Sequence, residues 1–239
     1  YREKHSMIRQ ANSTDDSILS LVRNSNKETM EENSNKKATL ISTQRDLIAG
    51  ECSKDITDRL LLPEKIVKAH KDGVLHFHDK DYFIQPIHNC CLVNIKDMLD
   101  NGTVMNDKLI ETPKSFQVAC IVTTQIIAAI SGGQYGGQSI DLKHLAKYVR
   151  VTYDKHYKKR YEKYIEKGYE KSEASERAKE DAIDRRNEEL KSGIQTIQYQ
   201  LNTLMTTNGQ TPFVTLFMYI VTKNNKHICT FIQIIITIL

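Results

Sequence analysis

The chain has 239 residues, of which 39% are hydrophobic and 27% charged, an ordinary balance for a globular protein. The net charge of +4 is too small to indicate a nucleic-acid partner. The N-terminus lacks the basic and apolar layout of a secretory signal. The uncharged run within residues 227–239 is too short to cross a bilayer as a helix. We therefore expect a soluble protein that binds neither nucleic acid nor membrane.

The chain contains five cysteines, at irregular spacing and without a Cys-x-x-Cys pair. An odd number in such an arrangement is not typical of a disulfide framework. A reducing compartment suits it better, so we predict a cytoplasmic protein. The cysteines are Cys52, Cys90, Cys91, Cys120 and Cys229.

The first part of the chain is predicted to be mostly helical. Residues 1–40 are polar, with one apolar patch in SILSLV, and indicate one or two solvated helices. Apolar residues then return at helical spacing between Ser42 and His70. Pro63 divides this stretch into two helices, because proline suits a first helical turn and not a helix interior. The next segment, residues 74–78, alternates in character and predicts a short strand.

The middle of the chain combines a turn, an apolar helix and a glycine-rich loop. Residues 92–99 lead into an Asn-Gly turn signal. Thr112 as the cap and Pro113 at the first helical position predict a helix that runs to Ser131. This helix is apolar nearly all round, so we expect it to be buried or to lie at a subunit interface. A glycine-rich loop, residues 132–137, follows it.

The segment from Tyr153 to Lys191 is highly charged, with basic and acidic residues interspersed. It predicts a long solvated helix, or helical pair, whose stripe of tyrosines packs on the core. A basic groove with stacking aromatics is the alternative, which the balancing acids disfavour. A further helix, an Asn-Gly loop and a strand at 213–220 complete the pattern. The tyrosines are Tyr153, Tyr157, Tyr161 and Tyr164.

Two short motifs are weak indicators of a ligand site. The loop GGQYGG (132–137) lacks the Gly-Lys-Ser/Thr of a P-loop and follows a helix, so we interpret its glycines as permitting a turn or a close backbone approach. In HFHD (76–79), two histidines on one face of a strand could bind a metal with Asp79 or Asp81. No third ligand has a persuasive spacing, so we predict no metal site and assign the histidines a structural or site-lining role.

The adjacent cysteines Cys90 and Cys91 have the richest setting. Neighbouring cysteines rarely bridge each other, because the geometry is strained, and they lack the gap with which two thiolates bind one zinc ion. Either both are packed in the core, or one is catalytic with His88, His76 or His78 as the base. The residue pattern alone leaves these alternatives open.

Several segments together resemble, in this order, the anaerobic (class III) ribonucleoside-triphosphate reductases, a family of glycyl-radical enzymes. The resemblance covers roughly residues 40–220, and the number of motifs in one order makes a chance match implausible. The segments are STQRDLIAGE, LLPEKI, HFHDKDYF, NCCLVNIKDMLDNGT, TPKSF, TQIIA, QYGGQS, TYDKH and NTLMTTNGQTPFVT.

The resemblance implies an α/β fold: an incomplete ten-stranded glycyl-radical-enzyme barrel that is predominantly helical in this fragment. In that family a glycyl radical oxidises a cysteine to a thiyl radical, which abstracts the 3′ hydrogen of the ribose. Formate is oxidised to carbon dioxide as ribonucleoside triphosphates become deoxyribonucleoside triphosphates for DNA synthesis. The complete enzyme is expected to hold a structural zinc and to need a radical-SAM activating enzyme.

The resemblance also assigns site residues. Cys90 would be the reducing cysteine, with Cys91 as its packed neighbour beside the substrate, and His76 would position formate or a proton. Further residues would line the cavity for the ribonucleoside triphosphate. They are Asn89, Asn208, Gly209 and Gln210.

An allosteric site for ATP or deoxynucleotide effectors is implied at a homodimer interface. Its residues carry charges and amides that suit a nucleotide, since lysines bind phosphates. The helix N-terminus near Ser115 would also favour an anion. The matching residues are Glu111, Lys114, Gln125 and Lys155.

We divide the chain into three parts. Residues 1–40 are a polar helical lead-in, the end of a missing ATP-binding regulatory domain, and 41–220 are the N-terminal part of the barrel with its dimer and effector helices. Residues 221–239 are an atypical tail that we interpret as a frameshift or truncation. We expect this chain alone to be inactive and to hold no cofactor. The alternatives are a non-catalytic deoxynucleotide-binding dimerisation module and a degenerate remnant.

Overall fold

The structure, a computed structural model, describes residues 12–27, 37–205 and 212–217. The chain divides into two compact units, each of which is described by itself. The first unit takes in the chain as far as Asn89 together with two short segments, Gly132–Tyr135 and Met205–Thr211. The second unit consists of Cys90–Ser131, Gly136–Leu204 and the chain from Pro212 onward.

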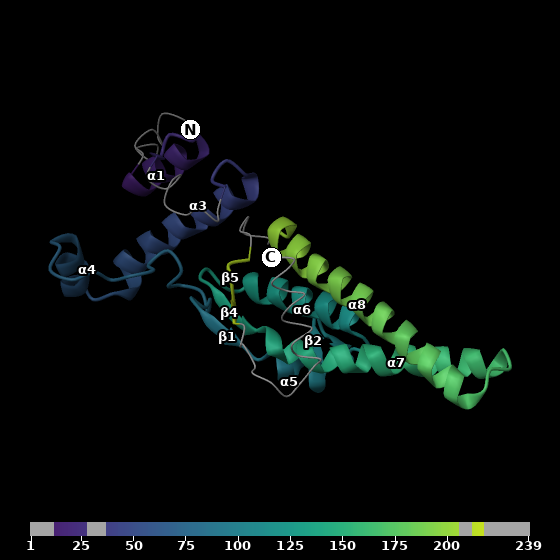
Figure 1. The fold of residues 1–239 in the computed structure, drawn as a ribbon. Coiled ribbons are helices and arrows are strands. Elements are labelled where there is room, and N and C mark those ends of the chain that lie inside the picture. Colours follow the sequence, from purple (N-terminus) through teal and green to yellow (C-terminus); the bar gives the residue numbers. More distant parts are fainter. Residues whose placement is uncertain (1–11, 28–36, 206–211, 218–239) are drawn as a thin grey trace. The chain divides into compact units, whose positions relative to one another are not determined.

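Helices build the first unit. They are α1 (Ser13–Val22), α3 (Ile41–Ile56), the π-helical turn η2 (Thr57–Leu61) and α4 (Glu64–Lys71) (Figure 1). The first of them starts with a capping box, in which the Asn12 side chain accepts from the Asp15 N–H at 2.8 Å and the Asp15 carboxylate accepts from the Asn12 N–H at 3.0 Å. Two helices between Ser42 and His70 were predicted, and this is confirmed, with Pro63 as the N-cap of α4.

The predicted strand at 74–78 is wrong. These residues form a loop, and the first unit contains no strand within its described residues. The Phe77 N–H, which a sheet would have used, donates instead to His70 Nδ1 at 3.2 Å. The loop is fastened to the helices, because Ser53 Oγ donates to the Lys80 carbonyl at 2.6 Å and Lys80 Nζ lies 3.0 Å from an Asp58 carboxylate oxygen.

A parallel sheet of three strands, in the order β1-β4-β5, organises the second unit. The strands are β1 (Cys91–Val93), β4 (Gln138–Asp141) and β5 (Val214–Phe217). Parallel neighbours need long crossover connections, and helices supply them here. Between β1 and β4 run α5 (Ile95–Asp100), the hairpin of β2 (Thr103–Met105) and β3 (Lys108–Ile110), and α6 (Phe116–Ser131). Between β4 and β5 run η3 (Leu142–Leu145), α7 (Ala146–Glu166) and α8 (Lys171–Thr203). The predicted α/β class is confirmed.

The apolar helix α6 starts later than predicted. Its first residue is Phe116, so Thr112 does not cap it and Pro113 is not its first residue. Thr112 Oγ1 donates to the Asp100 carbonyl at 3.0 Å and ties the preceding loop to the end of α5. The Asn-Gly turn that was predicted after residue 99 is present, and Gly102 has a φ of +80° that favours glycine.

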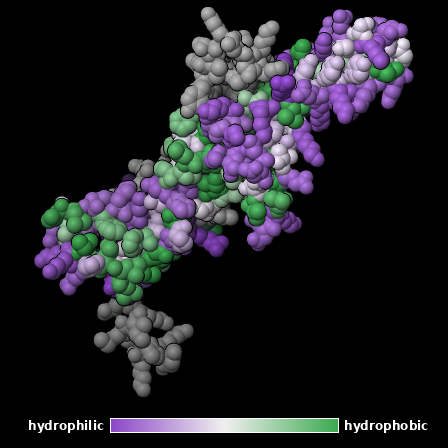
Figure 2. Space-filling model, turned by 90° about the horizontal axis from the view of Figure 1, so that it is seen from below, coloured by the Kyte–Doolittle hydropathy of each residue, from purple (hydrophilic) through white to green (hydrophobic). Residues whose placement is uncertain are grey.

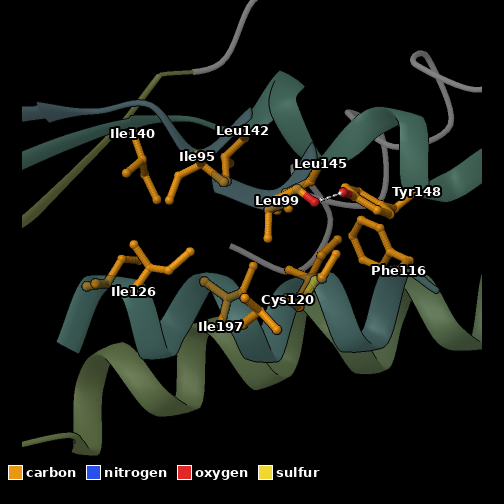
Figure 3. Packing of buried hydrophobic residues seen from close by; sticks show 14 of the residues in the cluster. Ile95, Leu99, Phe116, Cys120, Ile126, Ile140, Leu142, Leu145, Tyr148 and Ile197 are labelled. Atoms are coloured by element: carbon orange, nitrogen blue, oxygen red, sulfur yellow. Dashed lines mark hydrogen bonds between the residues drawn. The ribbon is translucent and has the colours of Figure 1, made fainter. Parts of the chain in front are cut away.

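One hydrophobic core lies between α6, α8 and the sheet of the second unit. Figure 3 shows Phe116, Cys120 and Ile126 of α6 facing Leu99 and other buried residues, with Tyr148 Oη donating to the Leu99 carbonyl at 3.1 Å. Gly193 of α8 allows this close packing, since a Cβ there would lie 2.7 Å from Phe116 Cε1 and 2.9 Å from Cys120 Sγ. The buried helix that the sequence predicted is therefore confirmed.

Helices α7 and α8 form the predicted helical pair. The tyrosine stripe of α7 meets α8: Tyr157 Oη lies 3.1 Å from Ser175 Oγ, and Tyr164 Oη donates to Asp181 Oδ2 at 2.9 Å. Small alanines on α8 make room for it, and the end of the pair is mostly hydrophilic at its surface (Figure 2). The strand predicted at 213–220 is present as β5, and its residues 218–220 lie outside the described ranges. No described helix is long and apolar enough to cross a membrane.

Candidate active site

The two adjacent cysteines differ in their surroundings. Cys90 is exposed and immediately precedes β1, whereas Cys91 is the first residue of that strand and packs against the hydrophobic core. The Cys91 N–H donates to the Gly137 carbonyl at 3.1 Å, and Cys91 pairs with Gln138 of β4. The two cysteines, like the others in the described part of the chain, carry thiols. The structure thus separates a packed thiol from an accessible one.

Gln138 and Gln134 fix the glycine-rich loop from within each unit. In the second unit, the buried Gln138 Nε2 donates to the Ile127 carbonyl at 2.9 Å and to Ser131 Oγ at 2.7 Å. In the first unit, the Gln134 Nε2 donates to the Asn89 carbonyl at 2.8 Å. A Cβ on Gly137 would lie 2.7 Å from Phe213 Cδ1, so this glycine permits the close approach that was predicted for the GGQYGG loop.

The HFHD motif forms a chain of polar contacts in the first unit. His76 Nε2 lies 3.1 Å from His78 Nδ1, and His78 Nε2 lies 3.2 Å from Asp79 Oδ1. Tyr135 of the glycine-rich loop donates its hydroxyl to the other carboxylate oxygen of Asp79 at 2.7 Å. The contact between Asp79 and Tyr135 could not be predicted from the sequence, because the two residues lie far apart in the chain and only the fold brings them together.

Tyr135 is itself held on two sides. Its ring stacks on Tyr82 with 4.1 Å between centroids, and its N–H donates to the His88 carbonyl at 3.0 Å. Partial burial and the hydrogen bond to Asp79 raise the pKa of Tyr135 to about 12. The phenol therefore stays protonated and donates to the carboxylate across the physiological pH range.

Not every predicted substrate residue can be placed. His76 and Asn89 belong to the first unit and Cys90 and Cys91 to the second. Both His76 and Asn89 are exposed. Asn208, Gly209 and Gln210 lie outside the described residues. Among the residues that are described, no group of three or more potential ligands could hold a metal ion.

The predicted effector residues all lie on the surface of the second unit. Glu111 and Lys114 precede α6, Gln125 lies on its exposed face, and Lys155 lies on the exposed face of α7. No ion pair joins either lysine to another residue in the described part of the chain. Along the same face of α6, Val118 and Ile121 are 45% and 39% exposed, an apolar stripe without charge.

The N-terminus of α6 is already occupied by a side chain of the protein. The Phe116 N–H donates to Thr152 Oγ1 at 2.7 Å and the Gln117 N–H to Glu189 Oε1 at 3.1 Å. His156 Nε2 lies 3.1 Å from the other oxygen of Glu189. These groups cap the helix from α7 and α8. The helix N-terminus was expected to favour an anion, and the carboxylate of Glu189 lies there.

The environment of Glu189 keeps it charged. Burial acts to raise its pKa, but hydrogen bonds from the Gln117 N–H, from His156 and from Thr152 outweigh burial and hold the pKa below its usual range. Sequence reasoning missed this residue, because one glutamate in a highly charged helix carries no signal of its burial.

A cavity of about 350 Å³ lies between α8, η3 and β5 in the second unit. Its lining is mostly apolar and includes Ile197, Leu201 and Phe213, with the amides of Gln198 and Asn202 as its polar groups. No titratable side chain is found among the described residues that line it.

These features describe an α/β protein with an accessible thiol at the edge of a parallel sheet. The family model of the anaerobic ribonucleoside-triphosphate reductases matches residues 32–239, which include the tail that the sequence analysis set apart. The chain is 39% identical over 203 residues to the anaerobic ribonucleoside-triphosphate reductase of Enterobacteria phage T4. It is 39% and 38% identical over 217 residues to the proteins of that name from Escherichia coli and Haemophilus influenzae.

The chain belongs to the anaerobic ribonucleoside-triphosphate reductase family. The matches cover 83% of this chain and 32% of the phage relative, and 90% of this chain and 28% of each of the two bacterial relatives. The chain therefore spans about a third of the length of these relatives.

Proposed function

We propose that this chain forms the N-terminal part of the catalytic barrel of a reductase that converts ribonucleoside triphosphates to deoxyribonucleoside triphosphates. The parallel order β1-β4-β5 with helical crossovers suits one arc of a ten-stranded barrel. A cytoplasmic location suits this reaction, because reducing compartments preserve thiols. The observation that carries the proposal is the accessible thiol of Cys90 next to the packed thiol of Cys91, in a chain of this family.

The reaction replaces the 2′ hydroxyl of the ribose by hydrogen. With formate as the reductant, formate and one proton are consumed, carbon dioxide and water are released, and two electrons pass to the ribose. A glycyl radical in the remainder of the enzyme, installed by a radical-SAM partner, supplies the initial oxidation. The zinc site of the complete enzyme is likewise assigned to that remainder.

Cys90 is the group of this chain that we assign to the reduction. A thiol S–H is weak enough to give its hydrogen atom to a substrate radical, and a cavity that excludes water protects that radical from side reactions. We propose that His76 positions formate or a proton. Further residues would line the substrate cavity of the complete enzyme, namely Asn89, Asn208, Gly209 and Gln210.

The test compares Cys90→Ser with Cys91→Ser in the intact reductase, activated anaerobically and supplied with labelled formate. We expect Cys90→Ser to abolish deoxynucleotide formation and the coupled release of carbon dioxide. Cys91→Ser is the matched control, and it should keep turnover within about tenfold of the wild type, because Cys91 packs against the core and only the Cys90 thiol is assigned to the reaction. Equal loss in both variants would remove Cys90 from its assigned role.

A second function is favoured by the surface of α6. Its uncharged stripe suits burial against a second copy of the chain, and Lys114 and Lys155 have no ion-pair partner among the described residues. We propose that Glu111, Lys114, Gln125 and Lys155 bind a deoxynucleotide or ATP effector at a homodimer interface. This function would persist in a chain without turnover.

Calorimetry with deoxynucleoside triphosphates and sedimentation of the chain test this second function. Lys114→Ala and Lys155→Ala should each weaken nucleotide binding about tenfold or more, since each removes a charge-assisted phosphate contact. Lys163→Ala, on the far end of α7, is the control. A monomer that binds no nucleotide would contradict the proposal.

A further inference from the structure

The chain of contacts in the HFHD motif determines where its protons lie. Asp79 is a carboxylate and accepts only, and its Oδ2 already receives the Tyr135 hydroxyl. His78 Nε2 lies 3.2 Å from Asp79 Oδ1, and two atoms with facing lone pairs would repel, so this nitrogen carries a proton. In neutral His78 the other nitrogen, Nδ1, is then an acceptor.

The same logic fixes His76. Since His78 Nδ1 accepts, the contact of 3.1 Å requires His76 Nε2 to donate to it. His76 Nδ1 is left with a lone pair. When His76 receives a proton at Nδ1, it can pass its Nε2 proton to Nδ1 of His78. His78 then becomes the imidazolium, and its charge lies next to the Asp79 carboxylate. The reverse sequence delivers a proton from His78 to a group bound at His76.

The geometry also provides an entrance for the proton. The His78 side chain is 75% exposed, so it exchanges protons with bulk water, whereas the Asp79 side chain is 28% exposed and held in place. Asp79 has a φ of +56°, a backbone conformation that the surrounding contacts must hold. The Tyr135 hydroxyl, the Tyr82 ring beneath it and the His88 carbonyl provide that support.

We propose that His76 and His78 form a two-imidazole proton relay, which Asp79 terminates and Tyr135 holds in position. The inference deepens the proposed function and rests on its placement of His76 beside the substrate. The reduction consumes one proton in each turnover, and the relay supplies that proton from solvent. His78, Asp79 and Tyr135 are positioning or relay residues, and His76 alone would meet the reactants.

The first experiment does not depend on turnover. In the chain labelled with ¹⁵N-histidine, a hydrogen bond between two imidazole nitrogens gives a scalar coupling between them. We expect one such coupling, from His76 to His78, and its loss in His78→Gln. Absence of the coupling in the wild-type chain, or its persistence in His78→Gln, would overturn the relay.

The second experiment uses the intact reductase and chemical rescue. His78→Gly should lower kcat about tenfold or more, within the range that positioned acid–base groups contribute, and added imidazole should restore it. His70→Gly is the matched control: its ring lies 5.4 Å from that of His76, but its Nδ1 accepts the backbone N–H of Phe77. Imidazole should not restore activity lost there, and rescue of both variants or of neither would reject the relay.

A third variant covers a failure of His78→Gly to fold. His78→Gln keeps a hydrogen-bonding side chain and cannot pass a proton, so its kcat should fall while the KM for nucleotide stays unchanged. An unchanged kcat would reject the relay. The Cys90→Ser variant distinguishes a failure of the proposed function from a failure of the relay. The proposed function fails if Cys90→Ser stays active. The relay alone fails if Cys90→Ser is inactive and the His78 variants behave like wild type.

Discussion

The two units of the chain hold their folds in different ways. The hydrophobic cluster of buried residues lies wholly in the second unit, where α6, α8 and the sheet meet. In the described part of the first unit, the buried apolar side chains are Leu21, Ala38 and Val67, and Thr43, Ser53 and Thr57 are buried beside them. Ion pairs and hydrogen bonds fasten its loops instead.

The first unit also leaves apolar side chains uncovered. Six large ones are between 37% and 79% exposed near η2, α4 and the following loop, where Figure 2 shows hydrophobic surface. Exposed clusters of this kind mark interaction surfaces, and the relatives are about three times longer than this chain. We infer that the second unit carries its own stability, whereas the first depends on further contacts. The six residues are Leu60, Leu61, Val74, Leu75, Phe83 and Ile84.

The largest effect is expected from Phe116→Ala. The variant empties the contact between α6 and Gly193, and truncation of a buried phenylalanine costs about 3–5 kcal/mol. Urea denaturation followed by circular dichroism should show this loss in the helical transition. Val118→Ala on the exposed face of the same helix is the control, and similar losses in both would mean that the core does not dominate.

Glu189→Gln should cost about 1–3 kcal/mol at pH 7, because it weakens the hydrogen bonds at the start of α6. Folding lowers the pKa of Glu189 from its ordinary 4.5. Its contribution is therefore complete above that value and is lost as the pH falls through the lower folded value. Denaturation at several pH values should show a weaker acid dependence in the variant. Glu188→Gln, at a side chain that is 66% exposed, is the control for the loss of stability at pH 7.

Lys80→Met tests the polar fastening of the first unit. Lys80 and Asp58 are 13% and 23% exposed, and loss of this pair should cost about 1 kcal/mol. Hydrogen exchange should speed up in the loop from Phe77 to Asn89 and stay constant in the amides of α6. Lys65→Met, at an exposed position on α4, is the control. Slower exchange of the loop, or faster exchange in α6, would contradict the separation of the two units.

Tyr135→Phe should have the smallest effect on stability, about 0.5 kcal/mol, because one hydrogen bond is lost at a partly exposed position. Its spectroscopic effect is clear. The raised pKa favours the neutral phenol in the folded state, so ionisation near pH 12 should release the hold on Asp79. Ultraviolet titration should lose one late-ionising tyrosine in the variant. Tyr199→Phe, at a 70% exposed residue, is the control and should keep that late-ionising tyrosine.

Sequence patterns predicted the second unit well, because its helices are specified locally. The charged pair α7–α8 and the apolar α6 follow from periodicity and composition, whereas the α/β class was implied by the resemblance. The start of α6 was not predicted correctly, since its cap comes from Thr152 and Glu189, which are distant in sequence. The capping preferences of Thr112 and Pro113 depend on neighbouring residues in the sequence, so they could not reveal a cap formed by distant side chains.

The HFHD motif was predicted less well from the sequence than the helices of the second unit. Alternation at 74–78 predicted a strand, and a strand needs a partner that the described first unit does not provide. The two weakest motifs of the sequence, HFHD and GGQYGG, turn out to meet at Asp79 and Tyr135. The resemblance predicts Cys90 and His76 as site residues, and the contacts of His76 with His78 became visible only in the structure.

An insertion of one residue at the start of β1 would exchange the environments of Cys90 and Cys91. Side chains alternate along a strand, so Cys91 and Val93 point to the core, and Leu92, which is 82% exposed, points away. This alternation of side chains along β1 thus decides which of the two neighbouring thiols is accessible. A one-residue slip would bury Cys90 and expose Cys91, so the register of this short strand decides which of the two sulfurs is exposed.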